Sequence, residues 1–247
     1  MTEIDTFLRT TIQLHLNWII CIGLIYIIIH TFKDKKGLGI LDIVLNYIPV
    51  LTHEFGHILF NKISGGRAND LVIVAKPSER RETGQQGFAV TQSRGRLNQI
   101  ITTFGGYIMP PIMLYIGFLM IDYQYPSIFV TAYLLIFLYF FLITSRKALP
   151  LLITVLLAVL LFFIFQNDNQ VMMVYLVSIT QHFILGVLLG EVLQSSWTIG
   201  TLTFAKQKID WDGSALKALT FIPVSVFSLM WIGLNIYIIY QLFNIYF

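Results

Sequence analysis

The chain consists largely of apolar runs, separated by short polar connections. An α-helix needs about 20 mostly apolar residues to cross the hydrocarbon core of a bilayer. Of the 247 residues, 56% are hydrophobic and only 12% are charged, whereas roughly 25% are charged in soluble domains. The sequence therefore predicts an integral membrane protein, organised as one domain over residues 1–247.

Seven apolar runs are predicted to cross the membrane, which gives an all-α polytopic fold. The run 171–204 is too long for one straight span, so we expect one span to residue 190 and then an irregular or re-entrant piece. Six or eight spans are the alternatives to seven. The predicted spans are 12–32, 40–63, 97–121, 127–144, 148–165, 171–190 and 215–243.

The third span is interrupted by Gly105-Gly106 and Pro110-Pro111. Helix breakers at membrane depth are tolerated only where protein or a water-filled cavity covers the freed backbone groups. We therefore expect this span to make room for another molecule.

One polar segment, residues 64–96, is long enough to fold outside the spans. Within it, residues 71–75 and 87–91 have the pattern of two short strands, on either side of a charged connection over 77–86. The sequence predicts a short β-hairpin-like insert directly after the second span.

The basic residues indicate an orientation in the membrane. With seven spans, all of the 16 Lys and Arg residues fall on one face except Lys33, Lys35 and Lys36. Because cytoplasmic loops are enriched in Lys and Arg, we predict a multi-pass protein of the cell membrane whose N-terminus and 64–96 insert are cytoplasmic. The net charge of +3 then reflects topology and not binding to nucleic acid.

Residues 53–57, His-Glu-Phe-Gly-His, form an H-E-x-x-H motif inside the second span. Two histidines four residues apart on a helix share one face, at the separation that two ligands of one zinc ion need. Glu54 is not needed as a ligand, but it is placed to take a proton from a metal-activated water. A pair of histidines hydrogen-bonded within the bundle is the alternative, although such side chains are costly in a membrane span and are functional candidates there.

A catalytic zinc site usually has three protein ligands, so one more must come from elsewhere in the chain. Asp212, Asp210, Glu191 and His182 are the candidates. Asp212 begins the last span on the face at which the second span ends, so it lies at a compatible depth.

Two further polar residues, Asp42 and Asn46, lie on the same stripe of the second span as the histidines. Asp42 is about 16 Å from His53 along the helix axis, so it cannot share the metal. We expect Asp42 to be a hydrated residue near the outer end of the span.

The H-E-F-G-H motif in a predicted span, followed by Ser64-Gly65-Gly66-Arg67, resembles the site-2 protease family of intramembrane zinc metalloproteases, and in particular a small bacterial branch of it. Residues 104–110 resemble that branch's small-Gly-Tyr-x-x-Pro element. Asp212-Gly213 resembles the family's aspartate-glycine pair, and Thr220 to Pro223 with Trp231 extends the match. The longer N-x-x-P-x-x-x-x-D-G pattern of better-known members is absent.

The resemblance implies roles for individual residues. His53, His57 and Asp212 would be ligands of one Zn²⁺ ion, and Glu54 the catalytic base. Residues of the third span would lie around the ligands or at the substrate: Gly105, Gly106, Tyr107 and Pro110.

The function implied is a zinc-dependent endopeptidase that hydrolyses peptide bonds in or near transmembrane segments of membrane proteins, as in regulated intramembrane proteolysis. Its partners would be the lipid bilayer and a membrane-protein substrate, which must unwind locally before attack. The strands over 71–75 and 87–91 are a candidate edge for the unwound segment. The alternative is a plain amphipathic hairpin that lies on the membrane surface. The alternatives are a zinc-binding membrane protein without protease activity, in transport or as a regulatory partner, and a membrane-bound peptidase that cuts soluble peptides.

Overall fold

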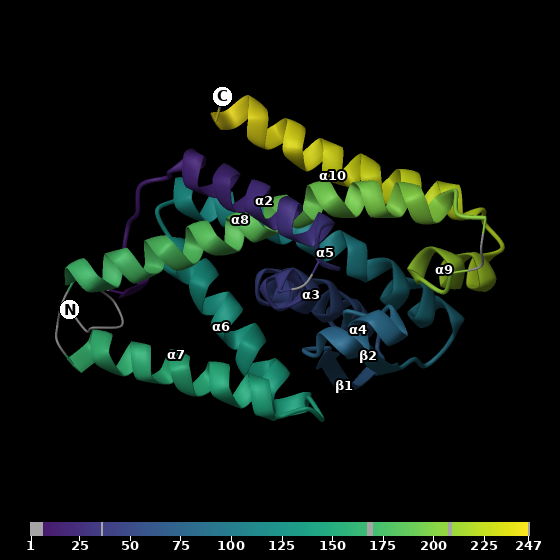
Figure 1. Cartoon of the computed structure of the whole chain (residues 1–247), viewed down its shortest axis with the longest axis horizontal. Coiled ribbons are helices and arrows are strands. Elements are labelled where there is room, and N and C mark those ends of the chain that lie inside the picture. Colours follow the sequence, from purple (N-terminus) through teal and green to yellow (C-terminus); the bar gives the residue numbers. More distant parts are fainter. Residues whose placement is uncertain (1–6, 36, 167–169, 207–208, 247) are drawn as a thin grey trace.

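The computed structural model describes the chain except residues 1–6, 36, 167–169, 207–208 and 247 (Figure 1). It is a helical bundle with one small antiparallel sheet. Its elements are α2 (Leu16–Thr31), α3 (Leu38–Ile63), β1 (Arg67–Ile73), α4 (Pro77–Thr83), β2 (Gly87–Gln92), α5 (Arg96–Asp122), α6 (Pro126–Ile143), α7 (Ala148–Gln166), α8 (Gln170–Thr203), α9 (Asp212–Thr220) and α10 (Val224–Tyr246).

Within the described residues, five helices are long and apolar enough to cross a membrane: α3, α5, α6, α8 and α10. Two more, α2 and the described part of α7, are apolar but shorter. These seven helices correspond to the seven predicted runs, so the mostly helical, multi-pass class is confirmed. The count of seven spans is not.

The prediction of a break after residue 190 is wrong, because α8 is one continuous helix of 34 residues. Its glycines are packing positions against α2. A Cβ on Gly186 would come within 2.5 Å of Ile22, and a Cβ on Gly190 within 2.5 Å of Tyr26. Small residues at a helix interface let two backbones approach closely without breaking either helix, which is why α2 and α8 lie side by side in Figure 1.

The third predicted span is also continuous, since α5 runs through Gly105-Gly106 and Pro110-Pro111. Each proline removes one backbone hydrogen bond, which the rest of a long buried helix can tolerate. Gly105 again marks close packing, because a Cβ there would meet the Phe60 side chain of α3 at 2.6 Å.

The last predicted span is in fact two helices, α9 and α10, separated by residues 221–223. Phe221 is in the left-handed conformation with φ of 63°, a common way for a helix to end. Pro223 follows two residues later and cannot continue the helix by donating a hydrogen bond. The break makes α9 a separate short helix that begins at Asp212.

The predicted hairpin is present, with β1 and β2 pairing from Arg67–Gln92 to Ile73–Gly87. The first strand begins and ends earlier than the predicted range 71–75, whereas β2 agrees with the predicted range 87–91 to within one residue. Their connection contains a helix that the sequence analysis missed, α4, which has Pro77 in its first turn. The hairpin folds back along α3, as shown by the close approach of Gly87 to Val50 and of Pro77 to Gly39.

This return path corrects one expectation. Asp42 is not an exposed residue near the end of the span: it is buried and contacts His30 at 2.8 Å (Nδ1 to Oδ1) and Arg80 at 3.4 Å (Nη1 to Oδ2). Arg80 and Arg81 of α4 line a cavity together with Lys33, so the connection between the strands lies near the start of α3.

Candidate metal centre

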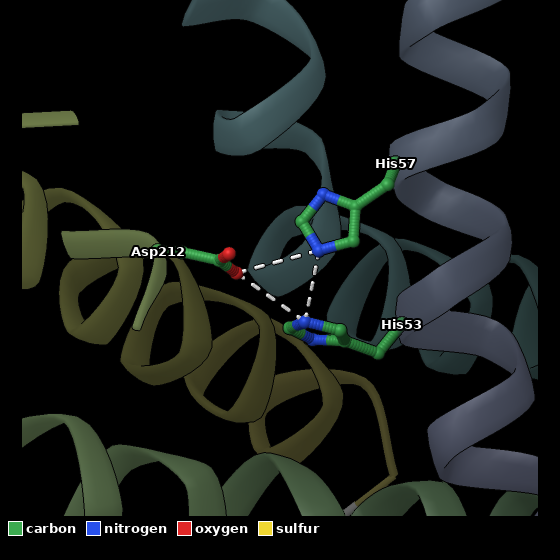
Figure 2. A group of neighbouring side chains, drawn as sticks. All are labelled: His53, His57 and Asp212. Atoms are coloured by element: carbon green, nitrogen blue, oxygen red, sulfur yellow. Dashed lines mark hydrogen bonds and ion pairs between the residues drawn. The ribbon is translucent and has the colours of Figure 1, made fainter. Parts of the chain in front are cut away.

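Helix α3 presents His53 and His57 from adjacent turns of one face, and both rings point toward Asp212 (Figure 2). The two Nε2 atoms are 3.2 Å apart. The Oδ2 atom of Asp212 is 3.3 Å from His53 Nε2 and 3.4 Å from His57 Nε2. Three potential ligand atoms therefore converge on one point, all within 4.8 Å of one another.

Asp212 reaches this point because it is the first residue of α9, where a negative charge is favoured by the helix dipole. Ser214 closes the turn: its Oγ accepts a hydrogen bond from the Trp211 backbone N–H at 3.0 Å and donates one to the Trp211 carbonyl at 2.7 Å. Burial would raise the pKa of the Asp212 carboxyl, but the adjacent His57 and His53 hold it below its usual range.

Aromatic side chains hold α9 against α5 and α10. The Tyr107 ring lies 4.7 Å from the His53 ring and 4.8 Å from the Trp231 ring, with Trp211 at 6.2 Å. Trp231 is fully buried and donates its indole N–H to the Phe104 carbonyl at 3.3 Å. This cluster fixes the segment that carries Asp212.

The orientation of His57 is set by α5. Its Nδ1 lies 2.9 Å from the backbone carbonyl oxygen of Thr102. A neutral imidazole that donates Nδ1–H to this carbonyl presents the lone pair of Nε2, and this is the usual arrangement around metal-binding histidines.

Glu54 lies beside the histidines, at the edge of a cavity of about 390 Å³. The same cavity is lined by His53, Tyr107, Glu191 and Trp211, among others. Strand β2 passes directly over the Glu54 side chain, since a Cβ on Gly87 would come within 3.1 Å of Glu54 Cγ. A buried carboxylate therefore faces a space in which a small part of another molecule could sit, next to three convergent ligand atoms.

A family model described as Peptidase M50B-like matches residues 10–242. The chain belongs to this family. The predicted resemblance to the site-2 proteases is thereby confirmed, and the protein is a membrane metalloprotease by family. Comparisons with curated proteins and with solved structures gave no match.

The residues of this M50B-like chain fit a single zinc ion. Two imidazole nitrogens and one carboxylate oxygen are the donor set of many catalytic zinc sites, and both Nε2 atoms are directed to the common point. Gly106 supplies the room, because a Cβ there would lie 2.5 Å from His57 Nε2 and 2.7 Å from His53 Nε2.

The other three candidates for the third ligand are not grouped with the two histidines, although Glu191 and Asp210 line the same cavity. The carboxylate of Glu191 accepts a hydrogen bond from Tyr26. His182 is fully buried, with its Nε2 2.9 Å from the His15 backbone N. Asp210 is exposed at the rim of the cavity. Within the described part of the chain, only Asp212 joins the two histidines in a group able to hold an ion.

The four third-span residues that the resemblance indicated divide into two pairs. Gly106 and Tyr107 contact the histidines. Gly105 packs on Phe60 of α3, and Pro110 is buried within α5. The last two shape the contact between the helices and do not border the ligand atoms.

Several contributors to the site were missed by the sequence analysis: the Thr102 carbonyl, Trp211 and Gly87. A backbone carbonyl has no signature in the sequence. Trp211 could have been found, because it precedes Asp212 and an aromatic side chain at the start of a short helix is a candidate anchor.

The room left by Gly106 gives a direct test. We expect Gly106→Ala to lower zinc affinity by more than about tenfold, because the added methyl group would overlap the two Nε2 atoms. Gly233→Ala is the matched control, since a Cβ on this α10 residue meets nothing within 4 Å. Chelator competition on the purified proteins measures both affinities, and equal values would contradict the geometry.

Proposed function

We propose that this M50B-like protein is a zinc-dependent intramembrane endopeptidase that cleaves membrane proteins in or near their transmembrane segments. The observation that carries the proposal is the convergence of His53, His57 and Asp212 beside Glu54 and a cavity. The histidines and Glu54 belong to α3, one of the helices apolar enough to cross a membrane.

The metal would be held by His53, His57 and Asp212. A zinc ion there would supply Lewis-acid activation of a water molecule and of the scissile carbonyl. Glu54 would take the proton of the attacking water and pass it to the leaving amine, as a general base and then a general acid. Tyr107 and Glu191 would contact the peptide, because both line the cavity that Glu54 faces.

A peptide bond inside a transmembrane helix is shielded by its own backbone hydrogen bonds, so the substrate must be held in an extended form. We propose that the hairpin holds it by strand addition. The support is its position: β2 crosses the Glu54 side chain at Gly87, so a segment paired along the sheet would lie close to the catalytic carboxylate.

The strand-addition role can be tested at Thr91 of β2. The Gln86 carbonyl accepts a hydrogen bond from Val74 N–H, and the Ala89 backbone hydrogen-bonds Glu54. Because backbone groups alternate along a strand, Ala89 and Thr91 direct theirs away from β1. Thr91→Pro therefore removes an amide N–H from this outer edge, whereas Thr91→Ala keeps it. We expect the proline variant to lose about tenfold in cleavage of a transmembrane substrate, on the scale of lost backbone hydrogen bonds, with its zinc affinity unchanged. Cleavage by Thr91→Pro at the rate of Thr91→Ala would rule the role out.

We further propose that the protein lies in the cell membrane with its N-terminus in the cytoplasm.

A search for the substrate tests the function as a whole: membrane proteomes are compared between cells with wild-type protein and cells with Glu54→Gln. A membrane protein that accumulates uncut only with the variant would be the substrate, and identical proteomes would count against a protease.

A further inference from the structure

We propose that Asn61 is a positioning residue for the metal centre, which acts through Thr102 to orient His57 and ties the hairpin to the same ligand. The inference rests on the proposed zinc site. Asn61 is one helical turn after His57 on α3 and is completely buried. It belongs to none of the motifs noted in the sequence.

Asn61 stands at the centre of a polar cluster between α3 and α5. Its Nδ2 donates to Thr102 Oγ1 at 3.0 Å and to Asn98 Oδ1 at 3.2 Å. In return, Asn98 Nδ2 donates to the Asn61 carbonyl at 3.0 Å. These contacts fix the first two turns of α5 against the last two turns of α3.

The cluster leads directly to the metal ligand. Thr102 Oγ1 donates to the Asn98 carbonyl at 2.7 Å, while the Thr102 carbonyl is the partner of His57 Nδ1 at 2.9 Å. Asn61 therefore holds the residue whose carbonyl sets the ring orientation of His57. Groups that orient metal ligands in this way typically contribute about 10–100-fold to metal affinity.

The same asparagine contacts both ends of the hairpin. The Gly66 N–H, just before β1, donates to the Asn61 carbonyl at 2.7 Å, and Asn61 Nδ2 lies 3.4 Å from Ser93 Oγ, just after β2. Gly66 has no room for a side chain, because a Cβ would come within 2.4 Å of the Asn61 amide. Asn61 thus contacts both the base of the hairpin and Thr102, the residue whose carbonyl orients the His57 ring.

The first test replaces only the hydroxyl that receives the Asn61 bond. Thr102→Val keeps the shape of the side chain and removes Oγ1, whereas Thr102→Ser keeps Oγ1. We expect the valine variant to lose about tenfold in zinc affinity by chelator competition and to change the visible spectrum of the Co²⁺-substituted protein. The serine variant should retain most of the affinity and the wild-type spectrum.

The second test compares two buried asparagines. Asn61→Ala is paired with Asn235→Ala, because Asn235 of α10 is also buried and donates to α8, to the Val192 carbonyl at 3.2 Å and to Ser196 Oγ at 2.9 Å. We expect only Asn61→Ala to weaken zinc binding at a comparable loss of thermal stability. In the metal-free protein it should also speed proteolytic cutting within residues 77–83.

The outcomes distinguish the positioning role of Asn61 from the proposed metal centre. Equal zinc affinities for Thr102→Val and Thr102→Ser, or for Asn61→Ala and Asn235→Ala, would overturn the positioning role alone. A wild-type protein with no zinc affinity would overturn the proposed metal centre and this inference with it.

Discussion

Replacing Glu54 with glutamine is expected to abolish proteolysis while zinc binding stays intact. The variant keeps the size and hydrogen-bonding shape of the side chain beneath Gly87, but an amide cannot accept the proton of the attacking water. General acid–base catalysis is typically worth about 10²–10⁴-fold, so cleavage of a transmembrane substrate should fall by at least about 100-fold.

The measurement pairs a cleavage assay in membranes with zinc content of the purified protein. Glu82→Gln is the control, because Glu82 is an exposed residue of α4. A Glu54→Gln protein that kept full biological function would favour the alternative of a zinc-binding protein without protease activity. Loss of both zinc and cleavage would instead place Glu54 among the residues that hold the metal.

Replacing Asp212 with asparagine is expected to remove the metal along with the activity. Its Oδ2 lies 3.3 Å and 3.4 Å from the two histidine Nε2 atoms, so the substitution removes the one negative charge among the three proposed ligands. Groups that only orient a ligand typically contribute about 10–100-fold to metal affinity. Loss of a ligand should lower zinc affinity by more than that.

Asp210→Asn is the matched control, two residues earlier and with the same change of charge. Asp210 borders the cavity but is exposed and outside the ligand group, so its variant should bind zinc as the wild type does. Zinc loss in Asp210→Asn with retention in Asp212→Asn would exchange the roles of the two aspartates.

Hydropathy locates the helices of this chain well, whereas glycine and proline positions do not locate their ends. Apolar runs predicted where helices lie, and α3 and α6 begin and end within a few residues of the predicted spans. The interruptions predicted at glycines in α5 and α8 are absent. In a sequence, a glycine that ends a helix cannot be distinguished from one that lets another helix approach. Only the packing partner, such as Tyr26 at Gly190, distinguishes them.

The surroundings of charged residues are likewise decided by packing and not by local sequence. The sequence analysis placed Asp42 in water, because a charged side chain near the end of a span usually faces water or the interior of the bundle. The structure instead returns the hairpin along α3 and pairs Asp42 with Arg80 and His30. Residues 38 positions apart meet because a strand pair packs against the helix, and no local pattern indicates that.

The sequence by itself determined the paired histidines and Glu54, since the spacing of residues on one helix is fixed by its 3.6-residue turn. It also determined the membrane class, because no soluble core could hide so many apolar runs. Only the tertiary structure grouped Asp212, of the four candidates, with the two histidines, brought the Thr102 carbonyl to His57 and laid Gly87 over Glu54. These contacts join segments from different helices, and their distances depend on how the helices pack rather than on where the residues stand in the chain.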